Sequence, residues 1–214
     1  MILNRSQKQE LLTKHAKFFA ADKNATNKVF QGIRYLKDGT ACVTDTHTLL
    51  RIKDVSSSTE ERTIHAITGA ELEGVFPSKD SIDNLLYWNQ VNQITLETSA
   101  QIELVTKYAR IAQLIEKELK SYDKIVKVAL NKANAFLQVS DQGVELNVHL
   151  GELAQDQNET WSFNADYLYN AFNIFKSAKS NSIVIKFRHQ NDAIVLRDEE
   201  NGIDVLILPI RSRM

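Results

Sequence analysis

Asp45 and His47 are the residues whose types and spacing most directly suggest chemistry. They lie two positions apart in a stretch that reads as a strand, so their side chains share one face and could bind a metal ion or exchange protons. A metal site needs more ligands, and the other histidines lack ligand-like spacing: His15, His65, His149 and His189. The structural alternative for His47 is a half-buried strand histidine with a satisfied hydrogen bond. We expect no metal and no cofactor.

Cys42 is the only cysteine, so neither an internal disulfide nor a cysteine-based metal site can form. Its apolar surroundings favour a small core residue over a nucleophile. The sequence contains no glycine-rich phosphate loop and no Gly-x-Ser-x-Gly motif. We therefore expect a protein that is not an enzyme, although catalytic residues assembled from distant positions remain an alternative.

Basic residues gather in two stretches that read as helices. Residues 4–17 hold four basic side chains against one acidic, and residues 106–127 hold six against three, while the whole chain has a net charge of −1. Such a separation favours a polarised surface that could attract an anionic partner. Long surface helices are often charged, so an ordinary solvated surface is the alternative.

The elements that must position these residues are clearest in residues 161–211. Asn164 can cap a helix, and the apolar residues that follow recur at helical spacing: Leu168, Ala171, Phe172 and Phe175. Three stretches rich in β-branched residues come next, and Asn201-Gly202 predicts a hairpin turn between the last two. A helix with one apolar face must bury that face on the sheet, which leaves its polar face free.

The first half shows a comparable order. We expect a helix over residues 5–19 with Leu11, Leu12, His15 and Phe18 buried, then several short strands. A short helix capped by Ser78 or Asp80 should run to Trp88 and bury the apolar residues Ile82, Leu85 and Leu86. Residues 93–98 and 101–105 alternate like a hairpin.

The order of a helix followed by strands then begins again near residue 104. A helical stripe is predicted at Leu104, Tyr108, Ile111, Ile115 and Leu119, followed by three strands and a loop over residues 151–158. The repeated pattern predicts an α+β chain of two similar domains, residues 1–105 and 106–214, in which helices pack on antiparallel sheets. The lone cysteine, the lack of an N-terminal apolar run and the lack of a membrane-length segment lead us to expect a cytoplasmic protein that does not bind membranes.

Three stretches, in order, resemble the bacterial sliding clamp family, the β subunit of DNA polymerase III. VFQGIRYLKDGTACVTDTHTLL (29–50) resembles a segment of that family's middle domain, and GVFPSKDSIDNLL (74–86) resembles its Val-Pro-Arg-Lys helix start. Residues 161–211 resemble the last domain, with its Phe-Asn-x-x-Tyr-Leu helix start and Met-Pro-Met-Arg-Leu tail. The resemblance covers about half of the chain, maps onto the second and third domains and implies a DNA-clamp fold without the first.

The resemblance implies a clamp that encircles double-stranded DNA with basic helices lining the hole. The residues of this sequence that could contact DNA are Arg5, Lys17, Lys107, Arg110, Lys117, Lys176 and Lys179. It also implies a groove that takes short apolar peptides of a DNA polymerase and a clamp loader. The matching groove residues are Phe30, Thr44, His47, Leu49, Leu206, Ile207, Leu208, Pro209, Ile210 and Arg211. The family's Gly and Arg beside the histidine are Thr46 and Thr48 here, so peptide preference is expected to differ.

Family rings contain six domains, so two domains per chain imply a homotrimer, as in a phage-like two-domain clamp. The leading hypothesis is therefore a sliding clamp and polymerase processivity factor in DNA replication. One alternative is a clamp-fold monomer that acts as an adaptor or inhibitor of clamp partners. The other is an enzyme built on the same fold.

Overall fold

The computed structural model describes residues 2–88, 91–119, 125–141, 144–189 and 191–210. The chain divides into two compact units. Unit 1 contains residues 1–89 and 197–206, and unit 2 contains residues 90–196 and 207–214. The division passes through strands β9 (Ile194–Asp198) and β10 (Ile203–Ile207).

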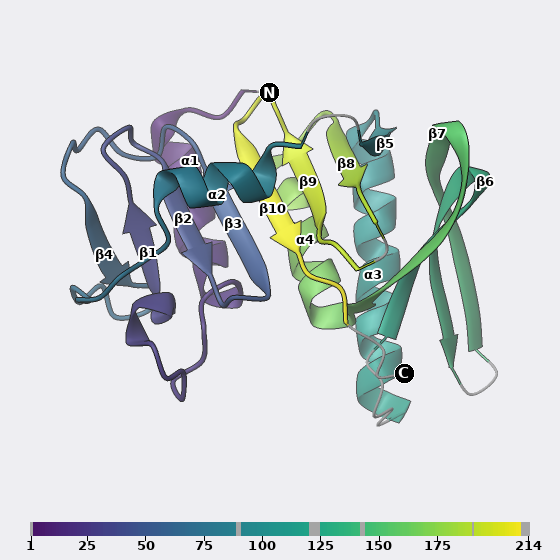
Figure 1. The fold of residues 1–214 in the computed structure, drawn as a ribbon, viewed down its shortest axis with the longest axis horizontal. Coiled ribbons are helices and arrows are strands. Elements are labelled where there is room, and N and C mark those ends of the chain that lie inside the picture. The colour runs from purple at the N-terminus through teal and green to yellow at the C-terminus, as the bar shows by residue number, and fades with distance from the viewer. Residues whose placement is uncertain (1, 89–90, 120–124, 142–143, 190, 211–214) are drawn as a thin grey trace. The chain divides into compact units, whose positions relative to one another are not determined.

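Unit 1 has an antiparallel sheet with the order β4-β1-β2-β3-β10. In Figure 1, helix α2 crosses in front of these strands and α1 lies behind them. The N-terminal elements of this unit are α1 (Arg5–His15), the 3₁₀ helices η1 (Ala16–Phe18) and η2 (Lys28–Gln31), β1 (Gly32–Tyr35), β2 (Ala41–Thr44), β3 (Thr48–Ile52), β4 (Arg62–His65) and α2 (Lys79–Leu86).

Both helices of unit 1 begin at polar caps. Asn4 and Gln7 form a reciprocal capping box at the start of α1, and the Ser78 side chain accepts from the Ser81 amide at the start of α2. Leu12 on α1 and Leu86 on α2 are fully buried. These caps satisfy amides that have no partner within the helix, while the buried leucines fix each helix on the sheet.

Unit 2 pairs two helices with strands. Its elements are β5 (Asn92–Leu96), α3 (Ser99–Leu119), β6 (Ile125–Asp141), β7 (Val144–Asn164), α4 (Ala165–Ala178), β8 (Ile183–Phe187) and the first part of β9. Strands β9, β8 and β5 form one sheet, and β6 and β7 form a long two-stranded hairpin that stands out in Figure 1.

The buried face of α4 was predicted correctly. Asn164 accepts a hydrogen bond from the Asp166 amide at 2.9 Å, and Leu168, Ala171 and Phe175 are completely buried. The predicted turn also forms, with Gly202 at φ +67°, a conformation that glycine adopts without a steric penalty.

Several sequence predictions were wrong. Residues 101–105 belong to helix α3 because Thr98 caps its start, with the Gln101 amide donating to the Thr98 hydroxyl at 3.2 Å. The expected loop over 151–158 continues strand β7, since its residues pair with β6 around a bulge. Phe18 and Leu85, expected to be buried, are 42% and 51% exposed, because η1 interrupts the first helix and Ile82 and Leu86 supply the buried face of the second.

The buried face of α3 also differs from the prediction. Ile102, Val105, Ala109 and Ala112 are buried, and small alanines let the helix approach its neighbours closely. Leu104 and Ile111, members of the predicted stripe, are 48% and 42% exposed. The prediction missed the first turn of α3, which contains the buried Ile102, and therefore assigned the wrong side of the helix to the core.

The expected domain boundary between residues 105 and 106 lies within α3, whereas the two compact units divide between 89 and 90. The backbone hydrogen bonds of this continuous helix tie the residues on both sides of that point together. None of the described helices is both long and apolar enough to cross a membrane.

Candidate nucleic-acid and peptide interfaces

Helices α3 and α4 pack against each other in unit 2 and carry most of the predicted DNA contacts. The Thr106 hydroxyl of α3 lies 3.4 Å from the Phe172 carbonyl oxygen of α4, which places the two backbones close together. Small residues on these helices, Ala109 and Ala171 among them, are buried. The polar sides of both helices are therefore displayed together.

The structure brings four of the predicted cations onto this helix pair. Lys107 lies 3.2 Å from Glu103, and Lys176 lies 4.0 Å from the same carboxylate. Hydrogen bonding by Lys107, followed by the charges of Lys107 and Lys176, lowers the pKa of Glu103. Lys117 lies 3.7 Å from Asp166.

Arg110 is held differently. Its guanidinium donates to the Gln113 side-chain oxygen and lies 5.2 Å from the centre of the Tyr169 ring. Gln113 in turn donates to Asp166, so one chain of hydrogen bonds joins α3 to the first turn of α4. Stacking on an aromatic ring leaves a guanidinium able to bind phosphate with its remaining N–H groups.

Cations outnumber carboxylates among the described charged side chains of α3, of α4 and of the residue that caps the C-terminus of α4. The cations are Lys107, Arg110, Lys117, Lys176 and Lys179, and the carboxylates are Glu103, Glu118 and Asp166. Exposed ion pairs contribute about 0–1 kcal/mol each, so a DNA phosphate could replace the carboxylate partner at little cost. The arrangement suits loose, sequence-independent binding of a polyanion.

The remaining two predicted DNA contacts lie in unit 1. Arg5 is the first residue of α1 and is exposed. Lys17 in η1 is also exposed, and its ammonium lies 5.0 Å from the centre of the Phe18 ring. These two residues are thus solvent-accessible cations of a different unit.

The first-half residues of the predicted peptide groove differ in accessibility. Thr44 and Leu49 are buried at 8% and 4% exposure. Leu206, a tail residue of the groove that belongs to the same unit, is buried at 5%. Phe30 is half-buried, with its ring 5.9 Å from that of Phe76. His47 is exposed.

A network within the β2–β3 turn displays His47. The Asp45 carboxylate accepts hydrogen bonds from the His47 and Thr48 amides at 2.9 and 2.6 Å, and from the Thr48 hydroxyl at 2.9 Å. Thr46 has φ +77°, which is strained for a β-branched residue. The Asp45 carboxylate therefore holds the turn in shape.

The tail residues of the predicted groove belong largely to unit 2. Ile207 is buried, Pro209 is half-buried, and Leu208 and Ile210 are 40% and 38% exposed. The Ile210 amide donates to the Ser162 carbonyl at 2.7 Å, which fixes the tail against β7. Arg211 lies outside the described residues. Two exposed aliphatic side chains on a fixed backbone can contact an apolar peptide.

Sequence reasoning missed a buried ion-pair cluster in unit 1. Arg51 donates to Asp204 from Nε at 2.9 Å and from a terminal nitrogen at 2.6 Å, and Arg197 donates to the other oxygen of Asp204. All three side chains are at least 90% buried. Arg51 and Asp204 are 153 positions apart, so no local pattern indicates the contact.

The arrangement of helices and sheets is that of a DNA sliding clamp. No protein-family model matches the chain, and no curated protein matches it in sequence. Solved structures match it in fold, which confirms the expected α+β clamp fold and the resemblance that the sequence motifs indicated. Among the described residues, no group of three or more His, Cys, Asp or Glu side chains could hold a metal ion.

Three of these structures illustrate the match. The DNA polymerase III β chain of Streptococcus pneumoniae aligns with a TM-score of 0.75 at 17% identity, over 99% of this chain and 64% of its own. The sliding clamp of Bacillus subtilis aligns with a TM-score of 0.74 at 15% identity, over 99% and 64%. The β subunit of Pseudomonas aeruginosa aligns with a TM-score of 0.73 at 11% identity, over 98% and 65%. The chain thus spans less than two thirds of each clamp.

Proposed function

We propose that this chain is a DNA sliding clamp: a non-catalytic processivity factor that encircles double-stranded DNA and tethers a polymerase. The observation that carries the proposal is the clamp fold, which matches over 98–99% of this chain. The cations of α3 and α4 support it, because exchangeable phosphate contacts hold a protein on DNA without fixing its position. A cytoplasmic setting fits this role.

We further propose that three copies form a ring. Each chain contains two compact units, and the chain spans about 64% of each bacterial clamp, so several copies are needed to surround a duplex. Light scattering should give the mass of a trimer. A stable monomer at high concentration would instead favour the adaptor or inhibitor function.

Topology provides the decisive test of encirclement. The protein is mixed with a duplex that is tethered to a bead at one end, and the free end is then closed with a bulky block. A ring should survive a wash at high salt, which removes phosphate contacts, and should leave when a restriction enzyme cuts the duplex. Complete release in the salt wash would exclude encirclement under these conditions.

The proposed DNA contacts have a separate test. Lys107→Glu and Lys117→Glu should weaken binding to a short duplex. Each should also reduce the slope of log affinity against log salt by about 1 for every phosphate that the variant no longer binds. Lys132→Glu, an exposed cation of β6, is the matched control. Equally weakened binding in all three variants would mean that overall charge, and not the helix surface, binds DNA.

We propose that polymerase and clamp-loader peptides bind at the groove residues, with Leu208 and Ile210 as the accessible aliphatic contacts. A fluorescent clamp-binding peptide should lose affinity for Leu208→Asp, because burying a carboxylate against an apolar peptide is costly. Ile67→Asp, at a site that is 76% exposed in unit 1, is the control. Unchanged affinity of Leu208→Asp would remove the groove assignment. Turnover in nuclease or phosphatase assays that is lost in His47→Ala would favour the enzyme alternative.

A further inference from the structure

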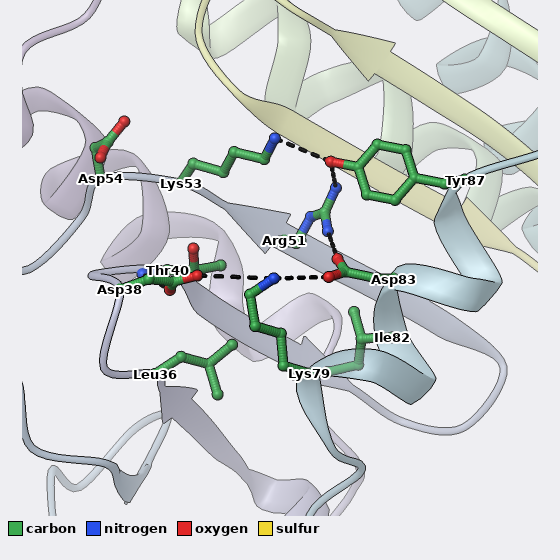
Figure 2. A pocket seen from close by; sticks show the side chains of 10 residues that line it. All are labelled: Leu36, Asp38, Thr40, Arg51, Lys53, Asp54, Lys79, Ile82, Asp83 and Tyr87. Carbon is green, nitrogen blue, oxygen red and sulfur yellow. Dashed lines mark hydrogen bonds and ion pairs between the residues drawn. The ribbon is translucent and has the colours of Figure 1, made fainter.

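Unit 1 contains a polar pocket of about 280 Å³ between strand β3 and helix α2. Figure 2 shows its lining, in which the Lys53 ammonium points to the Tyr87 hydroxyl and the Lys79 ammonium lies between Asp38 and Asp83. None of the predicted DNA or groove residues belongs to this lining. The pocket is lined by Leu36, Asp38, Thr40, Arg51, Lys53, Asp54, Lys79, Ile82, Asp83 and Tyr87.

The floor of the pocket is rigid. The Arg51 guanidinium donates to Asp83 at 2.5 Å and to the Tyr87 hydroxyl oxygen at 2.9 Å, while its other N–H groups bind Asp204. Arg197 lies with its guanidinium carbon 4.6 Å from the centre of the Tyr87 ring, and it also donates to the Leu86 carbonyl at 3.1 Å. The Tyr87 ring is therefore held in one orientation by two buried arginines.

The hydroxyl oxygen of Tyr87 accepts two hydrogen bonds from cations. Arg51 is one donor and the Lys53 ammonium is the other, each at 2.9 Å. A phenol that accepts twice must direct its own proton elsewhere, and the described residues supply no acceptor for it. Partial burial opposes the phenolate, but hydrogen bonding from Lys53 and the charge of Arg51 outweigh it and lower the pKa of Tyr87. This hydroxyl is consequently a strong donor.

Lys53 differs from the other cations of the pocket. Lys79 lies 2.7 Å from Asp83 and 3.9 Å from Asp38, and the charge of Arg51 is matched by Asp83 and Asp204. The Lys53 ammonium hydrogen bonds to a neutral phenol, and no described carboxylate lies within 4.0 Å of it. Its two further N–H groups and the Tyr87 proton thus form a cluster of donors with positive charge.

We propose that this pocket binds a small oxyanion, a phosphate or carboxylate group, through the Lys53 ammonium and the Tyr87 hydroxyl. Charge-assisted hydrogen bonds from an ammonium and a polarised hydroxyl match the lone pairs of an oxyanion. The volume accommodates a group of phosphate or malonate size.

The carboxylates of the pocket limit the affinity that we expect for an anion. Partial burial opposes ionisation of Asp83, but hydrogen bonding by Lys79 and the charges of Lys79 and Arg51 outweigh it and lower the Asp83 pKa, so Asp83 stays charged and paired. Asp54 lies 3.9 Å from Lys8. Repulsion from these carboxylates limits affinity, and we expect a dissociation constant of about 1–10 mM. Such a site would respond to metabolite-level concentrations of the anion.

The test follows the Tyr87 signal in protein labelled with ¹³C at the tyrosine ring carbon that bears the oxygen, with Tyr87→Phe used only to assign it. Inorganic phosphate and malonate are titrated separately at constant ionic strength. Either anion should shift the signal saturably, and the tighter one identifies the source of the oxyanion. A shift that rises linearly to about 100 mM with both anions would overturn the proposal.

Two variants separate binding from a general ion effect. Lys53→Met removes an exposed ammonium and keeps the Arg51–Tyr87 hydrogen bond, so the fold should persist while the dissociation constant rises about tenfold or more. Lys23→Met, an exposed lysine in a loop of the same unit, should bind as wild type does. An unchanged dissociation constant in Lys53→Met would also overturn the proposal.

Discussion

Acid should destabilise unit 1 through His15. This residue is completely buried on α1, and neither ring nitrogen has a hydrogen-bond partner among the described residues. Burial, with a smaller contribution from the charge of Lys14, lowers the pKa of His15 to about 4, from 6.5. The unfolded chain therefore takes up a proton at a pH where the folded unit does not.

The sign and size of the effect follow directly. Stability is complete above pH 6.5 and is lost as pH falls toward 4, because protonation favours the unfolded state throughout that window. At about 1.4 kcal/mol for each pH unit between the two pKa values, the loss reaches about 3 kcal/mol near pH 4. That is a large share of the roughly 5–15 kcal/mol that stabilises a typical domain.

Urea unfolding of wild type and His15→Phe at pH 7, 6, 5 and 4 measures this loss. The difference in free energy of unfolding between the two proteins should shift by about 3 kcal/mol in favour of the variant, because phenylalanine does not titrate. Leu11→Ala, on the same helix, should give a pH-independent difference from wild type. A flat difference for His15→Phe would refute the assignment of His15 as a buried neutral base.

Three further outcomes follow from unit 1. Thr46→Gly should stabilise the protein by about 0.5–1 kcal/mol in urea unfolding, because glycine relieves the positive φ, whereas Thr48→Gly in strand β3 should destabilise it. Asp204→Asn should lower the free energy of unfolding by about 3–5 kcal/mol in the same measurement, because it removes a negative charge that two buried arginines share. The control Asp54→Asn, at a side chain that is 73% exposed, should change the free energy of unfolding by less than about 0.5 kcal/mol. Burial raises the pKa of Cys42 to about 12, so a thiol reagent at pH 8 should label it only when the unit opens, and labelling at the free-thiol rate in native buffer would contradict this burial.

Local signals were sufficient for some elements and not for others. Helix α4 and the β9–β10 turn were predictable because a capping Asn164, a clear apolar stripe and an Asn-Gly pair act over a few residues. The start of α3 was not, since Gln101, Ile102 and Glu103 alternate as a strand does. Its buried side depends on Ala109 and Ala112, which a search for large apolar residues overlooks.

Local sequence signals were likewise sufficient for only some of the candidate sites. Cationic residues on α3 and α4 could be found from charge and helical spacing. The strain at Thr46 could not, because it arises from the hydrogen bonds that Asp45 makes around the turn. The pocket around Tyr87 combines residues of a strand and a helix with buried arginines, and its chemistry becomes visible only when tertiary contacts are known.

The contribution of residues 197–206 to unit 1 has a consequence for synthesis of the protein. Asp204, which neutralises Arg51, leaves the ribosome long after residues 1–89 have emerged. A nascent chain that stops short of this segment lacks the buried partner that Arg51 has in Asp204 and has an unfinished sheet edge, which is open to chaperones or aggregation. Native folding of the first-made unit must therefore wait until residues 197–206 have also been synthesised.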